Sequence, residues 1–315
     1  MKARSARFFL VFIARIFSDA KGTARPDLVR FVQKSFGYSL TGVTLEQCLS
    51  LLHGIGANGK TTLLNAMLHV FGDYGKQADP DLLLAKDGSE HPTGQADLFG
   101  CRLAVCTETN EGRRFDEARL KRMTGEDRIK ARFMRQDFFE FTPTHKIALA
   151  CNHKPAVRGT DHAFWRRIRL IPFDVCIPPN ERDKHLFEKL KSESAGILKW
   201  CVDGCFLWQK EGLEPPASVQ TATDAYQSEC DSFGRFVKEC CHLSPTAWAN
   251  TSELRGHYER FCKEIDLQAI NGAAFTGKLK GRGLLPGKMH GNRGWRGIGL
   301  LATVDGVDTV DGNSG

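Results

Sequence analysis

The feature that most limits how this chain can fold is the glycine-rich stretch HGIGANGKTT at residues 53–62. It contains the spacing Gly-x4-Gly-Lys-Thr, which is typical of loops that bind phosphate groups. An apolar segment at 47–53 predicts a β-strand before it, and the apolar spacing over 60–71 predicts a helix after it. Strand, glycine-rich loop and helix are the context that such a loop requires, because the positive end of the helix dipole then faces the phosphates.

The loop and the first helical turn supply the candidate nucleotide ligands. These candidates are Gly54, Ile55, Gly56, Ala57, Asn58, Gly59, Lys60, Thr61 and Thr62. Glycines let the backbone approach a phosphate closely. We expect Lys60 to reach the β- and γ-phosphates of ATP and the Thr61 hydroxyl to bind Mg²⁺. The alternative is a chance glycine-rich turn, which the flanking strand and helix disfavour.

The rest of the chain alternates apolar strands with helices. Strands are predicted over 102–107, 146–151 and 168–173, a hairpin over 128–141, a helix from the cap at Asp116 to Thr124, and a helix that begins at Pro26 and ends at Gly37. Further helices are predicted after 178 and, nearer the C-terminus, around 254–265 and 273–279. This alternation predicts an α/β fold with a parallel sheet, as in P-loop nucleotide-binding proteins.

Polar side chains follow two of these strands at the edge where the loop is expected. Glu108 ends the strand over 102–107, and Glu111 comes three residues later. Because parallel strands end at one edge, Glu108 can hold Mg²⁺ together with Thr61 and polarise water, whereas the alternative is a surface glutamate. Asn152 can bind a γ-phosphate or the attacking water, although an asparagine at a strand end is usually a turn former.

Three arginines surround the start of the last strand, at 166, 167 and 169. They are either a solvated face or they include an arginine finger. Such a finger stabilises transition-state charge at the nucleotide of a neighbouring subunit.

Two basic segments are candidates for binding nucleic acid. In the hairpin the candidates are Arg128, Lys130, Arg132 and Phe133, and near the C-terminus they are Lys278, Lys280 and Arg282. Cations bind backbone phosphate, and an aromatic ring can stack on a base. The alternatives are a solvated charged face and a basic linker, since a net charge of +7 allows a polyanionic partner without requiring one.

The order and spacing of these motifs resemble superfamily-3 helicases, specifically the helicase half of phage and plasmid primase–helicases, which are related to the poxvirus primase–helicase. The resemblance covers nearly the whole chain. It is carried by residues 36–42 (FGYSLTG), 56–61 (GANGKT), 107–112 (TETNEG), 121–125 (KRMTG), 141–146 (FTPTHK), 151–155 (CNHKP), 159–161 (GTD) and 164–173 (FWRRIRLIPF).

The resemblance implies a role for each matching residue in an AAA+-like core. Lys60 and Thr61 match the Walker A lysine and hydroxyl, Glu108 the Walker B acid, and Asn152 the polar sensor. Arg166 or Arg167 matches the finger that acts in trans in a ring, usually a hexamer. The hairpin matches the segment that projects into the central channel, and the C-terminal unit looks like the winged-helix module that often follows.

We therefore predict five segments. They are a helical N-terminal segment (1–46), the ATPase core (47–178), a helical extension and linker (179–230), a winged-helix-like DNA-binding module (231–301) and a disordered tail (302–315). The basic and apolar N-terminus resembles a signal peptide, but its spacing favours an amphipathic helix. The eleven cysteines lie mostly in apolar stretches without a CxxC pair, which indicates reduced thiols in a cytoplasmic protein.

The predicted function is an ATP-dependent DNA helicase in the replication of a phage, prophage or plasmid, within the bacterial host cytoplasm. The expected cofactors are ATP and Mg²⁺. The expected partners are single-stranded and forked DNA, further copies in a homo-hexamer, and a separate primase or other replication proteins, with no membrane. Because residues 1–46 leave no room for the family's upstream primase domain, we expect no priming by this chain itself.

Three alternatives stay open. The chain could be a nucleotide-regulated DNA- or origin-binding protein without catalysis. It could be an ATPase without a role in nucleic-acid metabolism. It could also be a fragment of a longer primase–helicase.

Overall fold

The computed structural model describes residues 6–19, 21–85, 93–107, 111–157, 161–265 and 267–301. Glu108 and the predicted disordered tail (302–315) lie outside these residues. The chain divides into two compact units, Met1–Gln227 and Ser228–Gly315. The division into five segments stays a prediction.

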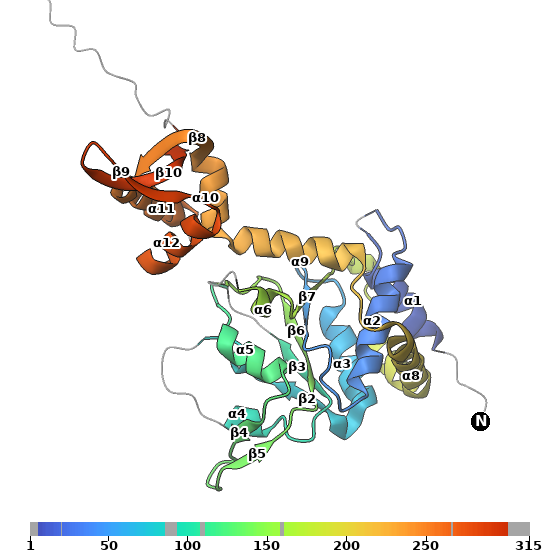
Figure 1. Ribbon diagram of the computed structural model, residues 1–315. Helices are drawn as coiled ribbons and strands as arrows, with labels where there is room; N and C mark the ends of the chain where they lie inside the picture. The colour runs from blue at the N-terminus through green and yellow to red at the C-terminus, as the bar shows by residue number, and fades with distance from the viewer. Residues whose placement is uncertain are drawn as a thin grey trace, which may run out of the picture. The chain divides into compact units, whose positions relative to one another are not determined.

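The first unit is built on a five-stranded parallel sheet (Figure 1). Its strand order is β2 (Gly75–Ala78), β3 (Leu103–Thr107), β6 (Lys146–Cys151), β1 (Leu49–His53) and β7 (Ile168–Pro172). The predicted α/β fold with a parallel sheet is confirmed. The sequence had not indicated β2, a short edge strand whose residues carry no apolar pattern.

The register of the sheet defines two edges. His53 pairs with Cys151 and Pro172, and Leu49 pairs with Ile147 and Ile168. The carboxyl ends of the parallel strands lie side by side, and we call this end of the sheet the loop edge, because the glycine-rich loop follows His53. We call the opposite edge, where the strands begin, the start edge.

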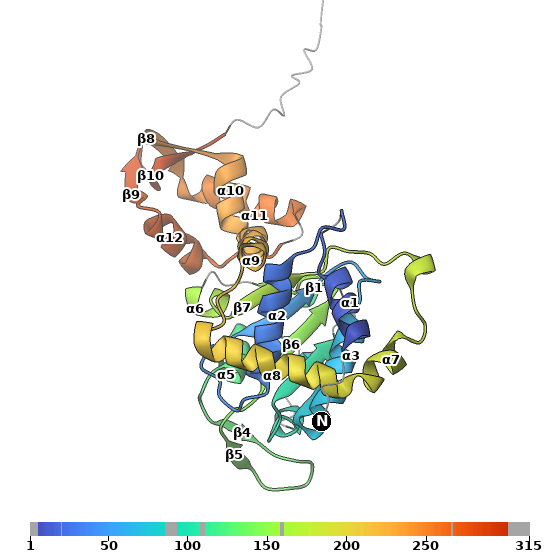
Figure 2. The same cartoon turned by 90° about the vertical axis from the view of Figure 1, so that its right-hand side faces the viewer.

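Helices cover both faces of the sheet (Figures 1 and 2). One face carries α1 (Arg7–Ile16), α2 (Pro26–Ser39), α3 (Lys60–Phe71), α7 (Leu186–Ser192) and α8 (Ser194–Glu211), and the other carries α5 (Glu117–Thr124) and α6 (His162–Trp165). The short α4 (Thr93–Ala96) contacts the hairpin, and α9 (Ala217–Cys230) follows α8. The predicted cap at Asp116 is confirmed, since its side chain accepts a hydrogen bond from Arg119 N.

The predicted end of α2 at Gly37 was wrong, because the helix continues to Ser39. Gly37 lies where α2 crosses α8, seen in front of the sheet in Figure 2. A Cβ atom at Gly37 would lie 2.1 Å from Cys205 N, and one at Gly204 would lie 2.1 Å from Gln33 O. The glycine therefore serves a close helix–helix contact rather than a helix stop.

The predicted amphipathic N-terminal helix is confirmed as α1, which buries Phe9, Phe12 and Ile16. The side chain of Glu193, the residue before α8, caps the N-terminus of α1 although it is distant in the sequence. Its carboxylate accepts hydrogen bonds from Phe8 N (3.0 Å) and Phe9 N (2.9 Å). A buried carboxylate at a helix N-terminus satisfies two free N–H groups and complements the helix dipole.

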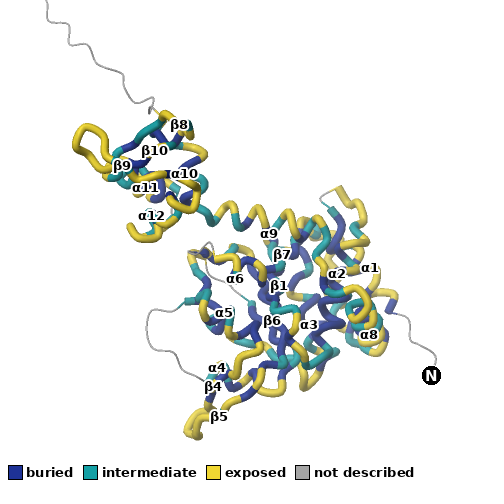
Figure 3. The backbone as a smooth tube through the Cα atoms, viewed as in Figure 1, coloured by how far each residue is buried: buried dark blue, intermediate teal, exposed yellow. Residues whose placement is uncertain are grey.

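The predicted hairpin is confirmed as β4 (Ile129–Ala131) and β5 (Phe139–Phe141), with Lys130 opposite Glu140. Only four residues separate β5 from the start of β6, so the hairpin adjoins the start edge. Its turn is exposed, whereas the strands of the main sheet are mostly buried (Figure 3).

The second unit has its own core, formed around Phe233, Tyr258, Phe275 and Trp295. Its elements are α10 (Ser232–Cys240), β8 (Cys241–Asn250), α11 (Thr251–Glu264), α12 (Gly272–Gly281), β9 (Leu285–Met289) and β10 (Asn292–Leu300). They form three helices and an antiparallel sheet of order β8-β10-β9. Both predicted helices are present as α11 and α12.

We did not predict β8, and Pro245 within it argues against a central strand. In the structure β8 is an edge strand, and its pairing with β10 is interrupted opposite Pro245, between Leu243 and Trp248. A proline without an N–H is tolerated there. The preceding α10 could have been found from the helical spacing of Phe233, Phe236 and Val237. Across the described ranges, no helix is long and apolar enough to span a membrane.

Candidate nucleotide site and basic surfaces

The glycine-rich loop connects β1 to α3 and adopts left-handed backbone conformations at three positions. The φ angles are +109° at Gly56, +50° at Ala57 and +85° at Gly59. Such conformations are typical of loops whose successive N–H groups converge on an anion. The exposed Ile55 takes no part in the core.

Two glycines of this loop are required by close packing. A Cβ atom at Gly54 would lie 2.4 Å from Phe173 O and 2.4 Å from Asn58 Nδ2. One at Gly59 would lie 2.6 Å from Ile16 Cγ2 on α1. The N-terminal helix therefore lies directly against the loop, a contact that the sequence did not predict.

The Lys60 side chain is buried at the loop edge and held by three neutral oxygens. Its Nζ donates to Gly54 O (2.5 Å), Asn58 Oδ1 (3.1 Å) and Asn152 Oδ1 (3.1 Å). Burial lowers the pKa of Lys60. Among the described residues no carboxylate forms an ion pair with it. Its positive charge is thus unneutralised by these groups, and phosphate oxygens can compete for it.

Asn58 carries a polar atom without a partner. The residue is 3% exposed, and its Nδ2 has no hydrogen-bond partner within the part of the chain that the structure describes. A buried donor without an acceptor is costly, which fits a site whose acceptor arrives with a ligand. Sequence reasoning had included Asn58 only as one member of the loop.

The described residues supply part of a magnesium site. Thr61, in the first turn of α3, is exposed and available as a ligand. Its predicted partner Glu108 lies outside the described residues. Within the described ranges no group of three or more His, Cys, Asp or Glu side chains could hold a metal by itself. One hydroxyl combined with phosphate oxygens is the kind of donor set that Mg²⁺ accepts.

Asn152 and Glu111 both lie near the loop edge. Asn152 follows β6, which is paired with β1, and this pairing brings its side chain to Lys60 although 92 residues separate them. Glu111 is exposed, with its Oε1 3.6 Å from His153 Nδ1.

A cavity of about 450 Å³ lies beside the loop, between α1 and residues 177–189. It is bounded by Ala57, Gly59 and Thr62 of the loop, by apolar side chains that include Val11 and Ile177, and by Lys189. Lys189 Nζ lies 5.4 Å from the ring centroid of Phe8, and Arg15 forms an ion pair with Glu181 at 3.0 Å. The unbroken apolar run at 8–13 was the signal in the sequence, because it exceeds one helix face and leaves the apolar Phe8 and Val11 exposed on α1.

The structure places Arg166 and Arg167 at the start edge, away from the chain's own loop. Arg167 is 8% exposed and donates to Ala163 O and, at 3.2 Å, to Gln47 Oε1. Arg166 is exposed and donates to the same Gln47 oxygen at 2.8 Å. Of the two candidates for a finger, only Arg166 is free to extend outward.

The hairpin candidates are all exposed, but its aromatic rings are partly engaged. The rings of Phe133 and Phe139 stack with centroids 5.4 Å apart. Lys130 Nζ and Arg132 Cζ lie 5.1 and 5.0 Å from the Phe138 centroid. Arg128 lies 3.9 Å from Glu140. Met134 and Phe138, which the sequence did not single out, are more exposed than Phe133.

The C-terminal candidates differ from one another in their partners. Lys278 Nζ lies 2.6 Å from Asp231 Oδ1, and Arg282 Nη2 lies 3.9 Å from Asp231 Oδ2. Lys280, on the same helix, is exposed, and no ion pair is found for it among the described residues. One carboxylate thus neutralises part of the basic stretch.

Comparison with known proteins agrees with the fold and with the motifs. Residues 52–167 match the model of a family described as "Family of unknown function (DUF5906)". The chain is 27% identical over 257 residues to "Putative helicase 022R" of Frog virus 3, covering 75% of this chain and 26% of that protein. It is 28% identical over 225 residues to "Putative primase C962R" of African swine fever virus, covering 64% and 23%.

Among solved structures, the apo C-terminal region (305–718) of NrS-1 superposes with a TM-score of 0.59. The alignment covers 93% of this chain and 76% of that one at 12% identity. At this identity it supports a shared fold alone. The core is a mixed α/β domain with a parallel sheet, consistent with a P-loop fold.

The relatives confirm the resemblance to the helicase part of primase–helicases. They are named helicases and primases of viruses with large DNA genomes. The chain spans about a quarter of the length of the curated relatives it matches.

Proposed function

We propose that this chain is the motor part of an ATP-dependent DNA helicase that acts in genome replication. The observation that carries the proposal is the arrangement of Lys60, which is buried at the loop edge and whose hydrogen-bond acceptors among the described residues are all neutral oxygens. The names of the relatives support a replication helicase in a viral context.

ATP would bind across the loop and the neighbouring cavity. The N–H groups of the loop and of the first turn of α3 would hold the phosphates. Lys60 would exchange one or more of its three oxygens for β- and γ-phosphate oxygens, and Asn58 Nδ2 would gain an acceptor. The cavity beside Thr62 has a volume within the usual range of small-molecule sites, and its apolar wall suits a base.

Magnesium would be held by Thr61 and Glu108. When bound, Mg²⁺ neutralises charge on the phosphates. Glu108 would also polarise the water that attacks the γ-phosphate, and Asn152 would orient that water or the phosphate. Arg166 of a neighbouring copy would stabilise the charge that develops, in a ring that we take to be a hexamer.

Single-stranded DNA would run along the hairpin. Lys130 and Arg132 would bind backbone phosphate, and the exposed rings near them would stack on bases. In the second unit, the order helix, strand, helix, helix, strand, strand is that of a winged helix. Its α12 and the β9–β10 hairpin would bind duplex phosphate, with Lys280 as the exposed cation of α12.

The proposal is tested by ATP hydrolysis and by strand displacement on a forked DNA substrate. Wild type should hydrolyse ATP faster with DNA, and Lys60→Ala should lose at least about 10²-fold in rate because the phosphates lose their main cation. Lys199→Ala, which removes an exposed lysine paired with Asp203 on α8, is the matched control. Undiminished hydrolysis by Lys60→Ala would rule out this site.

Strand displacement separates a helicase from a nucleotide-regulated DNA-binding protein. A protein that binds ATP and DNA but displaces no strand would favour the latter.

The hairpin is tested by the salt dependence of binding to single-stranded DNA. The double variant Lys130→Ala/Arg132→Ala should lower the slope of log K against log salt by about 1.4, since each lost phosphate contact contributes about 0.7. The double variant Lys199→Ala/Lys210→Ala, with two exposed cations of α8, should keep the slope. An unchanged slope in the hairpin variant would exclude these contacts.

A further inference from the structure

Two guanidinium groups at the start edge converge on one neutral oxygen. Gln47 Oε1 accepts from Arg166 Nη2 at 2.8 Å and from Arg167 Nη2 at 3.2 Å. Among the described residues, no carboxylate forms an ion pair with either arginine. Asp161 is near Arg167 but is paired with Lys121. The described part of the chain thus gathers two like charges without an ion-paired carboxylate, and Asp161 offsets only part of the charge on Arg167. Such an arrangement favours an incoming anion.

The backbone of Gln47 is held in an unusual conformation. Its φ is +46°, in the left-handed region that residues other than glycine seldom adopt. Such a conformation persists only where the surroundings fix it. Gln47 N donates to Thr44 O at 3.0 Å, which closes a turn directly before β1.

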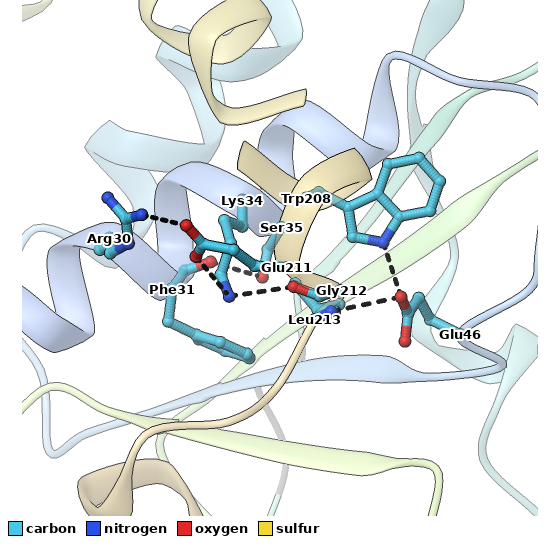
Figure 4. A network of polar contacts seen from close by, with 9 residues as sticks. All are labelled: Arg30, Phe31, Lys34, Ser35, Glu46, Trp208, Glu211, Gly212 and Leu213. Carbon is cyan, nitrogen blue, oxygen red and sulfur yellow. Dashed lines mark hydrogen bonds and ion pairs between the residues drawn. The ribbon is translucent and has the colours of Figure 1, made fainter. Parts of the chain in front are cut away.

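The residue next to Gln47 anchors this turn (Figure 4). Glu46 Oε1 accepts hydrogen bonds from Trp208 Nε1 (2.6 Å) and Leu213 N (3.3 Å). Glu46 N donates to Tyr38 Oη at 3.2 Å. Helices α2 and α8 therefore fix Glu46 from two sides.

On the other side of Gln47 the chain enters the sheet. Leu49 N donates to Arg167 O at 2.7 Å, which joins the first residue of β1 to the arginine pair. The amide of Gln47 is thus held at one place relative to both arginines. Gln47 adopts a costly backbone conformation, and its side chain binds two cations. We therefore infer that it positions them.

The two arginines do not serve the same end. Arg167 is buried and has a second acceptor in Ala163 O, so it forms part of the support. Arg166 is exposed, and its side chain is held by Gln47 alone among the described residues. Its guanidinium has further donors, which can bind a phosphate while one of them stays on Gln47.

We propose that Gln47 is a positioning residue that aims Arg166 at the phosphates of ATP bound to a neighbouring copy. The inference rests on the proposed function. A neutral amide is the suitable partner, because it orients the guanidinium without cancelling its charge. A carboxylate at this position would pair with both arginines and compete with the phosphate.

Two substitutions test the proposal, one by changing the charge of the side chain and the other by removing the side chain. Gln47→Glu keeps the shape of the side chain but neutralises the arginines. Gln47→Gly removes the amide and relieves the backbone, since glycine adopts a positive φ freely. Gln47→Glu should keep at least the melting temperature of wild type, because it keeps an acceptor for both arginines. Both variants should keep the affinity for ATP, while kcat falls by about 10²-fold, the size of effect that a misplaced catalytic group produces.

ATP hydrolysis by mixtures of two inactive variants is a second test, because a purely structural role of Gln47 predicts no recovery of activity on mixing. Lys60→Ala keeps Gln47 and Arg166, and Gln47→Glu keeps an intact loop. In a mixed ring, a Gln47→Glu subunit supplies an intact loop, and a Lys60→Ala neighbour supplies a correctly held Arg166. Such a pair should regain hydrolysis, so the rate of the mixture should exceed the sum of the rates of the two pure variants.

Three outcomes would overturn the inference. They are wild-type kcat in both Gln47 variants, a fall in kcat that only follows a fall in melting temperature, and mixtures that add without recovery. These outcomes are distinct from failure of the proposed function, which would appear as wild type without hydrolysis or as an active Lys60→Ala.

Discussion

The two edges of the parallel sheet each bury a lysine, and the two lysines have different kinds of partners. At the loop edge, Lys60 Nζ donates to two side-chain amide oxygens and one loop carbonyl. At the start edge, Lys146 Nζ donates to the backbone carbonyls of Thr41, Val43 (3.4 Å) and Thr144 (3.1 Å) and lies 4.8 Å from the Tyr38 ring centroid.

The difference shows which lysine can act on a ligand. Side-chain amides can rotate away when a better acceptor arrives, whereas the backbone carbonyls at the start edge belong to segments fixed by α2 and the sheet. Lys146 therefore joins residues 41–43 to the start of β6, and its role is structural. Lys60 is poised to change partners, and its role is in binding.

The largest expected effect separates the two arginines at the start edge. Arg166→Ala should lower kcat for ATP hydrolysis by about 10³-fold or more, the range measured for arginine fingers, with an unchanged free energy of unfolding. Arg167→Ala should lower the free energy of unfolding by about 1–3 kcal/mol, because the buried guanidinium and its hydrogen bonds to Ala163 O and Gln47 Oε1 are lost. Steady-state kinetics and urea unfolding of both variants would measure this, and equal kinetic losses would contradict it.

The next contrast concerns the stability of the two lysine sites. Lys146→Met should lower the free energy of unfolding by about 1–3 kcal/mol, because three partly buried backbone carbonyls lose the donor that they share. Lys60→Met should lower it by less, by about 1 kcal/mol or below, because water can replace the ammonium at the exposed Asn152 and only Gly54 O and Asn58 Oδ1 lose a donor. Urea unfolding measures both. Equal losses would show that Lys60 is also a structural residue.

The smallest effect is a dependence of stability on pH. Burial, and to a lesser extent Arg102, lowers the pKa of Lys146 to about 7. The neighbouring thiols of Cys101, Cys48 and Cys205 act in the opposite direction. In the unfolded chain a lysine holds its proton up to about pH 10. Between these values the unfolded state binds more protons, so the free energy of unfolding should rise with pH, by at most about 1.4 kcal/mol per unit.

The measurement is the difference in unfolding free energy between wild type and Lys146→Met at pH 6, 7.5 and 9. Groups common to both proteins cancel in this difference. It should be constant below pH 7 and should grow in favour of wild type above it. A difference that stays flat to pH 9 would mean that the carbonyl oxygens and the Tyr38 ring keep Lys146 charged.

Local patterns predicted most of the fold of the first unit. The helix after Asp116 was predicted with its correct bounds, because a capping side chain and a following glycine act within a few residues. The end predicted at Gly37 was wrong because the decisive contact comes from Cys205 and Gly204, far along the chain. The pairing of Asp231 with Lys278 was missed for the same reason.

In the candidate site, too, local features were predicted and contacts between distant segments were not. The sequence indicated the loop, Lys60, Thr61 and Asn152 because each follows from a motif or a strand end. It did not indicate the cavity behind α1, since that cavity exists only where α1 packs against the loop. Nor could it distinguish Arg166 from Arg167, because adjacent residues share every local pattern and differ only in what surrounds them.

The sequence by itself determined the phosphate-binding loop between a strand and a helix, the strands that end in polar residues, and the basic hairpin. These depend on spacing within one element, where the periods of helix and strand and the freedom of glycine act directly. Only the tertiary structure decided that Asn152 meets Lys60, that Arg167 is buried while Arg166 is exposed, and that Gln47 holds both arginines. Each of these depends on contacts between residues about 90 to 120 positions apart, which the packing of helices on a parallel sheet brings together.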